Sequence, residues 1–320
     1  MKNTLISTIP GKTAIEEAHE RIRPYIHRTP VLTCESINRI AGATVFFKCE
    51  NFQKVGAFKF RGASNAVFSL NDEALIRGVA THSSGNHAQA LALAAKKKGI
   101  PAYIVMPENA SGVKIEAVKG YGAKVIFCKS SLDAREKTLE KVVNDTGSTF
   151  IHPYDDYRII AGQATAAKEL IEDTAQLDII VTPVGGGGLL SGTALAAKYF
   201  SSGTMVYAGE PMGADDAYKS LQEGKIVPSI NPDTIADGLL TSLGEKTFEI
   251  IQREVQEIIT VDDDEIIAAM KLLWERMKIV VEPSGAVPFA AVLKSRKLFS
   301  AKSVGIILSG GNVDLTKLPF

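Results

Sequence analysis

The stretch Gly-Ala-Phe-Lys-Phe-Arg-Gly, residues 56–62, places one lysine between two phenylalanines, just before apolar residues at helical spacing. A glycine that opens such a run is typical of a turn, so the pattern predicts a helix with Lys59 in its first turn. A lysine amine in apolar surroundings loses part of its preference for the charged form and can then attack a carbonyl. The alternative is that Lys59 rests its stem on the two rings and keeps its amine in water.

The composition is that of an ordinary globular chain. Its 320 residues, 45% hydrophobic and 22% charged, suffice for one large or two ordinary domains. The 36 basic and 36 acidic residues balance without a long run of either sign, which argues against nucleic acid or a membrane surface as partner. The three cysteines are dispersed and match no disulfide or metal spacing. We therefore expect a cytoplasmic protein without a signal peptide or a membrane span.

The residues around the lysine stretch predict a helix, an extended segment and a strand. Thr13 and Glu16 form a capping-box pattern, which predicts a helix from Thr13 to Pro24. Residues 28–32 read as extended because they include a proline, whose preceding residue avoids the helical region. Residues 44–50 have the composition of a strand that leads the chain towards Lys59.

After residue 78, predicted strands and helices alternate. The first series has strands at 79–81, 103–106 and 125–128, and helices at 86–98, 111–119 and 132–143. The second has strands at 178–184, 205–208, 255–261 and 304–308, and helices at 161–172, from 189 and at 262–278. Such alternation favours parallel sheets with crossover helices. The fold class is therefore α/β, with a small domain at 72–151 and a large domain formed by 1–71 and 152–320.

Polar or glycine-rich loops follow three of these strands, at the end where parallel sheets bind ligands. The first loop, Ser83-Ser84-Gly85-Asn86-His87, brings hydroxyls and backbone N–H groups to the start of a helix. Such a helix start attracts anions, so the loop predicts a site for a substrate carboxylate. The alternative, an ordinary helix cap with a glycine turn, needs fewer residues of this kind.

The other two loops extend the predicted site. Consecutive glycines let the backbone turn its N–H groups towards a phosphate, and a flexible turn is the alternative. Four glycines stand between a buried strand and a helix: Gly185, Gly186, Gly187 and Gly188. The residues after them match neither a P-loop nor the dinucleotide-binding pattern. In the third loop, at residues 309–312, Ser309 places a hydroxyl at the end of an apolar strand, which is a weak signal alone.

A reactive lysine, a phosphate loop and a hydroxyl at one crevice together suit pyridoxal 5′-phosphate, which offers an aldehyde, a phosphate and a ring nitrogen. Serine at the ring nitrogen leaves that nitrogen closer to neutral than aspartate would. The ring is then a weaker electron sink, which favours prompt loss of a β-substituent over transamination.

In the order and spacing of these four motifs, the chain resembles the threonine/serine dehydratase and serine racemase family, pyridoxal phosphate enzymes of fold type II (tryptophan synthase β-like). The resemblance covers nearly the whole chain. It implies two open, twisted α/β domains with the cofactor in the cleft between them. It also implies β-elimination of β-hydroxy amino acids such as L-serine and L-threonine to a 2-oxo acid and ammonia. Because the sequence stops soon after residue 312, feedback control by isoleucine is not expected.

The resemblance also implies roles for single residues. Lys59 would be the Schiff-base lysine and would remove the α-proton, while Phe58 would pack beside the cofactor ring. Asn86 would lie at the ring hydroxyl, the tetraglycine at the phosphate, and Ser309 at the ring nitrogen. The loop from Ser83 to His87 would hold the substrate carboxylate.

Ser84 points to one subgroup. Many dehydratases of the family have alanine at this position, whereas serine racemases and 3-hydroxyaspartate dehydratases have serine. Racemisation needs an acid or base on each face of the planar carbanion, and Lys59 serves only one face. A hydroxyl at Ser84 could serve the other, or it could only contact the carboxylate. Serine racemase activity is therefore expected beside elimination, and a primary racemase remains an alternative.

A metal site is suggested by Glu210, which ends a strand, and by Ala214 and Asp216 in the loop after it. Two carboxylates and a backbone carbonyl suit a hard cation with water completing its shell. Spacing alone favours a solvated acidic turn, while the resemblance implies Mg²⁺, Mn²⁺ or Ca²⁺. Such an ion would fix the loop rather than take part in the chemistry.

Several alternatives stay open. A β-replacement enzyme such as cysteine synthase usually has a different asparagine loop, and a non-catalytic amino-acid sensor would not need both Lys59 and Ser84. L-Serine, L-threonine and L-threo-3-hydroxyaspartate differ in one substituent, which Arg135 and Ser242 could reach; both could equally be surface residues. An arginine there would suit a second carboxylate. The family suggests a homodimer, and a nucleotide such as ATP is a candidate effector.

Overall fold

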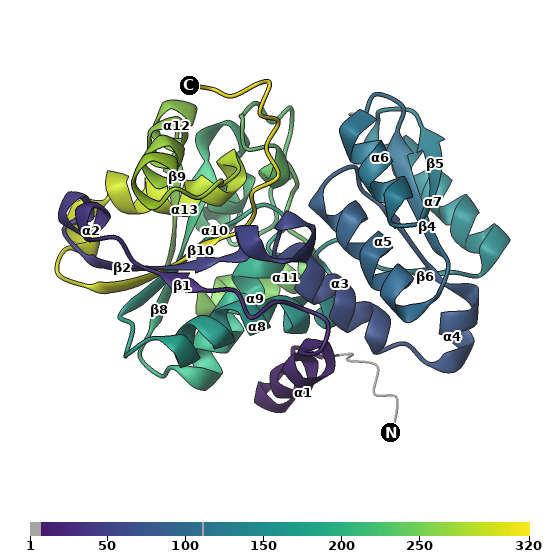
Figure 1. Ribbon diagram of the computed structural model, residues 1–320, viewed down its shortest axis with the longest axis horizontal. Coiled ribbons are helices and arrows are strands. Elements are labelled where there is room, and N and C mark those ends of the chain that lie inside the picture. Colours follow the sequence, from purple (N-terminus) through teal and green to yellow (C-terminus); the bar gives the residue numbers. More distant parts are fainter. Residues whose placement is uncertain (1–7, 111) are drawn as a thin grey trace.

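The computed structural model describes residues 8–110 and 112–320, and its strands form two separate sheets (Figure 1). In the larger sheet all neighbours are parallel except β1 and β2. Its order is β1 (Val31–Leu32), β2 (Thr44–Cys49), β10 (Ser303–Leu308), β7 (Ile179–Pro183), β8 (Met205–Pro211), β9 (Glu257–Val261). The smaller sheet is parallel throughout. Its order is β5 (Lys124–Cys128), β4 (Ala102–Pro107), β3 (Val79–His82), β6 (Thr149–Phe150).

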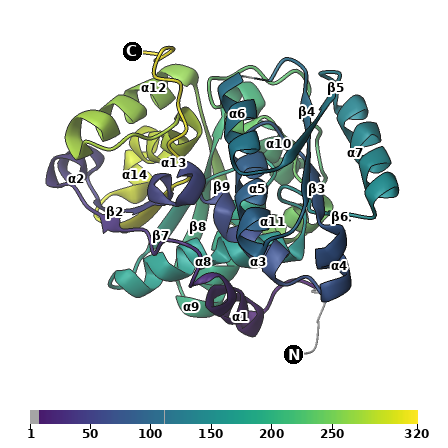
Figure 2. The same ribbon diagram turned by 45° about the vertical axis from the view of Figure 1, so that its right-hand side comes forward.

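The helices cover both sheets on both faces. The following helices lie on the larger sheet or pack against the helices that cover it: α1 (Lys12–Ile22), α2 (Glu35–Ala41), α8 (Tyr157–Asp173), α9 (Gly188–Phe200), α10 (Asp216–Glu223), α11 (Glu245–Glu254), α12 (Asp263–Leu272), α13 (Pro283–Lys294) and α14 (Arg296–Phe299). Those of the smaller sheet are α4 (Asp72–Arg77), α5 (Asn86–Lys98), α6 (Gly112–Gly120) and α7 (Leu132–Thr146). Helix α3 (Lys59–Phe68) packs against both α5 and α8 and so joins the two parts (Figure 2).

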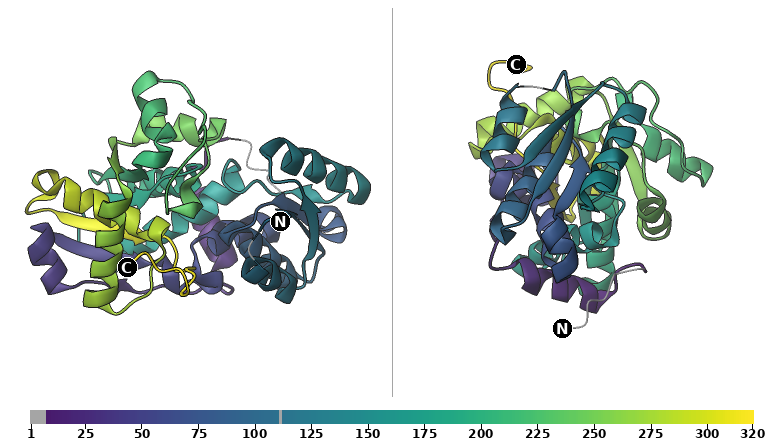
Figure 3. Two further views of the ribbon diagram at one scale, coloured as in Figure 1. Left: turned by 90° about the horizontal axis from the view of Figure 1, so that it is seen from above. Right: turned by 90° about the vertical axis from the view of Figure 1, so that its right-hand side faces the viewer.

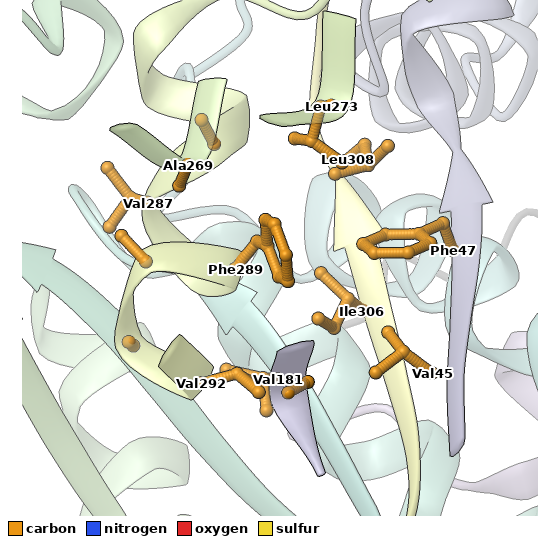
Figure 4. Packing of buried hydrophobic residues seen from close by; sticks show 14 of the residues in the cluster. Val45, Phe47, Val181, Ala269, Leu273, Val287, Phe289, Val292, Ile306 and Leu308 are labelled. Atoms are coloured by element: carbon orange, nitrogen blue, oxygen red, sulfur yellow. The ribbon is translucent and has the colours of Figure 1, made fainter. Parts of the chain in front are cut away.

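The core of the larger sheet follows the two-residue period of its strands, which sends alternate side chains to opposite faces. Ile306 and Val181 point to one face, where they meet α12 and α13. Figure 4 shows Phe289 of α13 packed there against Phe47, with ring centroids 5.5 Å apart and edge to face. Ile307 points to the other face, which α8, α9 and α11 cover.

The smaller sheet is built in the same way. Val79 and Ile104 face the apolar side of α5, whereas Ala80 and Val105 face α7. Viewed from above, this part of the chain lies beside the larger sheet (Figure 3). All four strands of the smaller sheet fall within residues 72–151, and the domain boundaries themselves stay a prediction.

The predicted alternation of parallel strands and helices is confirmed, and the elements expected around the loops are present. The capping box was wrong: α1 begins at Lys12 after Gly11, with no side-chain cap, so Thr13 lies inside the helix. A Thr-x-x-Glu spacing also occurs within helices, and the turn at Gly11 starts this one earlier. The expected start of α6 at Ser111 lies outside the described residues.

The helix predicted over 262–278 begins as expected. Asp262 and Glu265 form a reciprocal capping box at its start. The α-helix ends at Leu272 and widens into a π-helical turn over Leu273–Met277. It stops at Lys278, which adopts a left-handed conformation with φ 59°. Within the residues described, no helix combines the length and the apolar character needed to cross a membrane.

Candidate active site

Lys59 and Ser309 are 250 positions apart in the chain, but the backbone joins their segments directly. Ala57 and Gly310 form an isolated antiparallel bridge. The backbone N–H of Phe58 donates to the carbonyl of Ser309 at 3.0 Å. The end of β10 therefore lies against the start of α3, so Lys59 and Ser309 stand on adjoining segments. The role of both in one cofactor site stays a prediction.

The Lys59 amine lies in apolar surroundings. Its Nζ donates to the backbone carbonyl of Pro153 at 3.0 Å and lies 5.1 Å from the centroid of the Phe58 ring. Burial lowers the pKa of Lys59 from 10.5 to about 8. At pH 7 such a pKa leaves roughly one amine in ten uncharged, against about one in three thousand without the shift. The nucleophilic interpretation of Lys59 therefore has a physical cause.

The turn at residues 151–155 shapes the wall opposite Lys59, and sequence reasoning missed it. His152 Nδ1 accepts the backbone N–H groups of Tyr154 at 3.2 Å and Asp155 at 2.8 Å. Burial lowers the pKa of His152 to about 4, so the imidazole is neutral and Nδ1 is free to accept. These bonds fix the turn that carries the Pro153 carbonyl. A signal was available, since this polar turn directly follows the strand at residues 149–150.

The serine loop connects β3 to α5, as predicted. The backbone N–H of Ser83 donates to Val105 at 3.1 Å, and the Ser83 hydroxyl accepts from the Gly85 N–H at 3.3 Å. Helix α5 begins at Asn86 without a side-chain cap. Its first N–H groups are therefore open to an anion. Within the described residues the half-buried Ser84 hydroxyl makes no hydrogen bond, which leaves it available to a ligand.

His87 differs from the other members of this loop. Its side chain is 3% exposed, and Nε2 lies 3.4 Å from the carbonyl of Ile151. Burial, followed by the nearby charge of Lys59, holds the pKa of His87 well below its usual value. The imidazole is thus neutral and packed inside, so only the backbone N–H of His87 remains a candidate for the substrate carboxylate.

The tetraglycine forms a tight cradle at the start of α9. A Cβ on Gly186 would come within 2.3 Å of the Tyr154 ring, and one on Gly187 within 2.8 Å of Thr247. Gly187 also has φ +87°, which side chains rarely adopt. The Thr247 hydroxyl donates to the carbonyl of Gly186 at 2.9 Å. Helix α9 has no side-chain cap, so its first N–H groups are open, as a phosphate site requires.

These residues fit pyridoxal phosphate. The cradle around Gly186 suits its phosphate, and the desolvated amine of Lys59 suits its aldehyde. The Ser309 side chain is 3% exposed, and its hydroxyl makes no hydrogen bond among the described residues. It can therefore serve a ring nitrogen, as the sequence suggested.

Glu282 is the second part of the site that sequence reasoning missed. Its carboxylate is buried and accepts a hydrogen bond from Asn86 Nδ2 at 3.0 Å. Burial raises the pKa of Glu282 to about 7. The sequence did contain a signal for it. An acidic residue that directly follows an apolar run, here residues 279–281, can be buried together with that run.

The predicted metal residues gather where β8 meets α10. Both oxygens of Glu210 accept backbone N–H groups at the start of α10, from Ala217 at 2.8 Å and Tyr218 at 2.7 Å. Asp216 is buried, and neither of its carboxylate oxygens has a partner among the described residues. Burial raises the pKa of Glu210 to about 9 and that of Asp216 to about 6. An orphaned buried carboxylate beside a second one suits a cation, and buried Ala214 lies in the turn between them.

The two residues suggested for the substrate side chain lie in different settings. Arg135 of α7 is half-buried, and its buried Nε makes no hydrogen bond among the described residues. Burial lowers the pKa of His82, the residue before the serine loop; the charge of Glu136 opposes this shift and that of Arg135 adds to it. The Ser242 hydroxyl accepts the backbone N–H of Ser229 at 2.8 Å and so holds the loop between α10 and α11. Contact of either residue with substrate stays a prediction.

Comparison with known proteins gives concordant matches. The family profile described as "Pyridoxal-phosphate dependent enzyme" matches residues 22–310. Serine racemase of Dictyostelium discoideum is 53% identical, over 95% of both chains. The beta-hydroxyaspartate dehydratase of Paracoccus denitrificans is 51% identical, over 98% of this chain and 99% of the relative. The solved structure of maize serine racemase is 47% identical, with a TM-score of 0.94 over 97% of this chain and 95% of the other.

Proposed function

Because this chain belongs to the family of pyridoxal-phosphate-dependent enzymes, we propose that it converts β-hydroxy amino acids to 2-oxo acids and ammonia by β-elimination, and that it also racemises serine. The observation that supports this most directly is the desolvated Lys59 amine, with its pKa lowered to about 8. This amine donates to the carbonyl of Pro153, and the carbonyl of Ile151 in the same turn lies 3.4 Å from Nε2 of His87 in the serine loop. A base and a carboxylate-binding loop thus meet at one place.

The cofactor would be held by Lys59, by the tetraglycine cradle, by Ser309 and by Asn86, with Phe58 beside its ring. When bound, pyridoxal phosphate supplies an aldehyde that links to the amino group of the substrate and a ring that withdraws electrons from its α-carbon. The open N–H groups at the start of α5 then bind the substrate carboxylate. This contact orients the bond between the α-carbon and its hydrogen.

Lys59 acts as the general base for elimination. The amino group of the substrate would take the place of Lys59 on the cofactor aldehyde and so free the lysine. In its uncharged form the freed amine takes the α-proton, and the β-hydroxyl takes up one proton and leaves as water. The enamine that is released hydrolyses to a 2-oxo acid and ammonia. The water lost in the first stage is regained in the second, so the net products of L-serine are pyruvate and ammonia.

Racemisation uses the same proton removal followed by protonation from the opposite face. Lys59 occupies one face, and the Ser84 hydroxyl is the donor that we assign to the other. This hydroxyl is half-buried and makes no hydrogen bond among the described residues, which leaves it free to exchange a proton. The similarity to proteins named serine racemase and beta-hydroxyaspartate dehydratase supports this choice over a plain dehydratase.

The substrates we propose are L-serine, L-threonine and L-threo-3-hydroxyaspartate. Arg135 is the residue whose charge would favour the last of these, through its second carboxylate. Glu210, Asp216 and the carbonyl of Ala214 would hold Mg²⁺, Mn²⁺ or Ca²⁺, which would order the loop rather than enter the chemistry. We also propose that the protein forms a homodimer, that a nucleotide such as ATP acts as an effector, and that the protein is cytoplasmic.

The experiment that tests the proposal replaces Lys59. In the presence of pyridoxal phosphate, Lys59→Ala should lose 2-oxo acid formation from L-serine and L-threonine to the detection limit. Lys97→Ala, which removes an exposed lysine of α5, is the matched control and should keep the activity of the unaltered chain. Retained turnover in Lys59→Ala would contradict the assignment of the base.

A further inference from the structure

The buried carboxylate of Glu282 has a place in the site that the proposed reaction does not yet use. Its side chain is 4% exposed, and its backbone N–H donates to Gly310, next to Ser309, at 3.0 Å. The residue precedes α13 but does not cap that helix with its side chain. A Cβ on Gly310 would lie 2.6 Å from Glu282 Oε1, so a glycine is needed there to admit the carboxylate.

Glu282 and Asn312 together hold the side chain of Asn86. Asn86 Nδ2 donates to Oε1 of Glu282 at 3.0 Å and lies 3.3 Å from Oε2. On its other side, Asn86 Oδ1 accepts from Asn312 Nδ2 at 2.9 Å. Glu282 Oε2 also accepts the backbone N–H of Asn312 at 3.0 Å, which closes the ring of contacts. Asn312 Nδ2 donates in addition to the carbonyl of Val55 at 2.7 Å.

These contacts fix which way the Asn86 amide points. A flipped amide would set Oδ1 against the Glu282 carboxylate and Nδ2 against the amide nitrogen of Asn312, and both contacts would repel. In the observed orientation, one Nδ2 hydrogen is taken by Glu282 and Oδ1 is taken by Asn312. An asparagine amide carries two N–H hydrogens, so one remains for a ligand oxygen.

We propose that Glu282 is a positioning residue that orients Asn86, so that the free Nδ2 hydrogen faces the ring hydroxyl oxygen of bound pyridoxal phosphate. The inference rests on the placement of Asn86 in the proposed function. It assigns Glu282 to cofactor binding and to the ionisation of the ring hydroxyl, through Asn86. A purely structural role would be to join the loop after β10 to the start of α5.

Several charged groups near Glu282 affect whether its carboxyl group is ionised, and the ionised form is the one that orients Asn86. Burial and, to a smaller extent, the charge of Asp237 raise its pKa, whereas the bonds from Asn86 and Asn312 and the charge of Lys114 lower it; together they set the pKa at about 7. Only the ionised carboxylate accepts both donors without presenting a hydrogen of its own. Both measurements below are therefore made at a pH well above 7.

The test compares Glu282→Gln with the unaltered chain. Gln keeps the volume, but its Nε2 faces one of the two donors, so the amide of Asn86 loses its fixed orientation. Pyridoxal phosphate is titrated into apoprotein, and both its dissociation constant and the ratio of its near-ultraviolet and visible absorption bands are recorded. We expect binding to weaken at least about tenfold, as for a lost hydrogen bond to a charged group, and the band ratio to shift. Glu275→Gln, at an exposed glutamate, should change neither.

Asn86→Ala separates positioning from structure. If Glu282 acts through Asn86, adding Glu282→Gln to Asn86→Ala should leave affinity and band ratio unchanged. If the double variant binds pyridoxal phosphate more weakly than Asn86→Ala by the full factor seen for Glu282→Gln, the proposal is overturned. An unchanged affinity and band ratio in Glu282→Gln itself would also overturn it. If Glu282→Gln does not fold, Asn312→Ala serves instead, because it removes the other hydrogen bond that orients Asn86. An unaltered band ratio in Asn312→Ala would also contradict the proposal. The titration uses no substrate, so its result does not depend on whether the proposed reaction takes place.

Discussion

At the scale of single residues, the structure gives a chemical reason for the reactivity that the sequence around Lys59 suggested. The phenylalanines beside Lys59 suggested an apolar setting, and the observed burial lowers the pKa of its amine to about 8. The sequence could predict Lys59 from its place between two phenylalanines at the start of a helix, and Ser309 from its place between the end of an apolar strand and a glycine. Pro153 and Glu282 carry weaker signals, a polar turn after a strand and a carboxylate beside an apolar run. Neither signal names a partner, because only the fold brings these residues to Lys59 and Asn86.

The lowered pKa of Lys59 predicts how cofactor attachment depends on pH. Only the uncharged amine attacks the aldehyde, so the rate at which apoprotein captures pyridoxal phosphate should rise with pH and level off above a midpoint of about 8. Attachment can be followed by borohydride trapping and mass measurement of the labelled peptide. A midpoint near 10.5, the value of an unshifted lysine, would contradict desolvation of Lys59.

At the scale of elements, a buried charge cluster anchors the helix that begins with Lys59. Arg61 of α3 donates to Glu50 at 2.7 Å and to Glu169 of α8 at 2.7 Å, and all three side chains are buried. Lys48 of β2 also donates to Glu169 at 2.7 Å. Arg61 thus connects α3 to α8 and to Glu50, the residue that directly follows β2, within two residues of Lys59. The sequence placed these residues on their elements but gave no sign of their pairing, which depends on the packing of distant segments.

Glu169→Gln should destabilise the fold by about 3 kcal/mol, because it removes the buried anion that Lys48 and Arg61 share and leaves Lys48 only a 3.9 Å contact with Asp173. Urea unfolding at pH 7 measures the difference. Buried but paired with His19, Arg61 and Lys48, Glu169 has a pKa held well below its usual value. Its contribution is therefore complete above the unfolded value of about 4.5 and is lost as pH falls below it. The gap between variant and parent should close at low pH.

The matched control for this prediction is Glu172→Gln on the same helix. Glu172 pairs with Arg28 and Lys168 but is 40% exposed, so its loss should cost no more than about 1 kcal/mol. If Glu169→Gln and Glu172→Gln lower the free energy of unfolding equally, the buried cluster contributes no more to stability than the exposed ion pairs do.

The loop between β8 and α10 gives a second prediction at this scale. Asp216 has no partner for its carboxylate among the described residues, so Mg²⁺ at about a hundred times its dissociation constant should stabilise the protein by about 2.7 kcal/mol. Thermal unfolding with Mg²⁺ and with a chelator measures the shift. Asp216→Asn should remove the response, whereas Asp145→Asn, at an exposed position on α7, should keep it. A response that survives Asp216→Asn would place the cation elsewhere.

Elements also show where local patterns mislead. The helices and strands around the loops followed from hydrophobic alternation, which depends on burial over many residues. The Thr13 capping box failed because it rests on one residue pair, and Gly11 ends the preceding segment first. The π-helical turn at Leu273–Met277 has no signature in the sequence, because it keeps the apolar spacing of a helix.

At the scale of the whole molecule, the candidate site lies between the parts of the chain that carry the two sheets. Lys59, the tetraglycine, Ser309 and Glu282 belong to segments around the larger sheet, whereas Asn86 and the serine loop begin α5 of the smaller one. Bonds across this junction include those of Asn86 with Glu282 and of Lys114 with Asp237, the latter at 2.7 Å. The sequence predicted the two series of strands, but only the fold shows that Asn86 and Glu282 are partners.

The measurement that tests the central claim most directly is the product pattern from L-serine. Purified enzyme with pyridoxal phosphate and Mg²⁺ is incubated with L-serine, L-threonine or L-threo-3-hydroxyaspartate, and 2-oxo acid and D-serine are quantified for the parent and for Ser84→Ala. We expect pyruvate and D-serine from the parent. In Ser84→Ala, D-serine formation should fall at least about a hundredfold while pyruvate formation persists, because only the second proton donor is lost. Absence of both products in the parent, or D-serine formed equally fast by Ser84→Ala, would contradict the account.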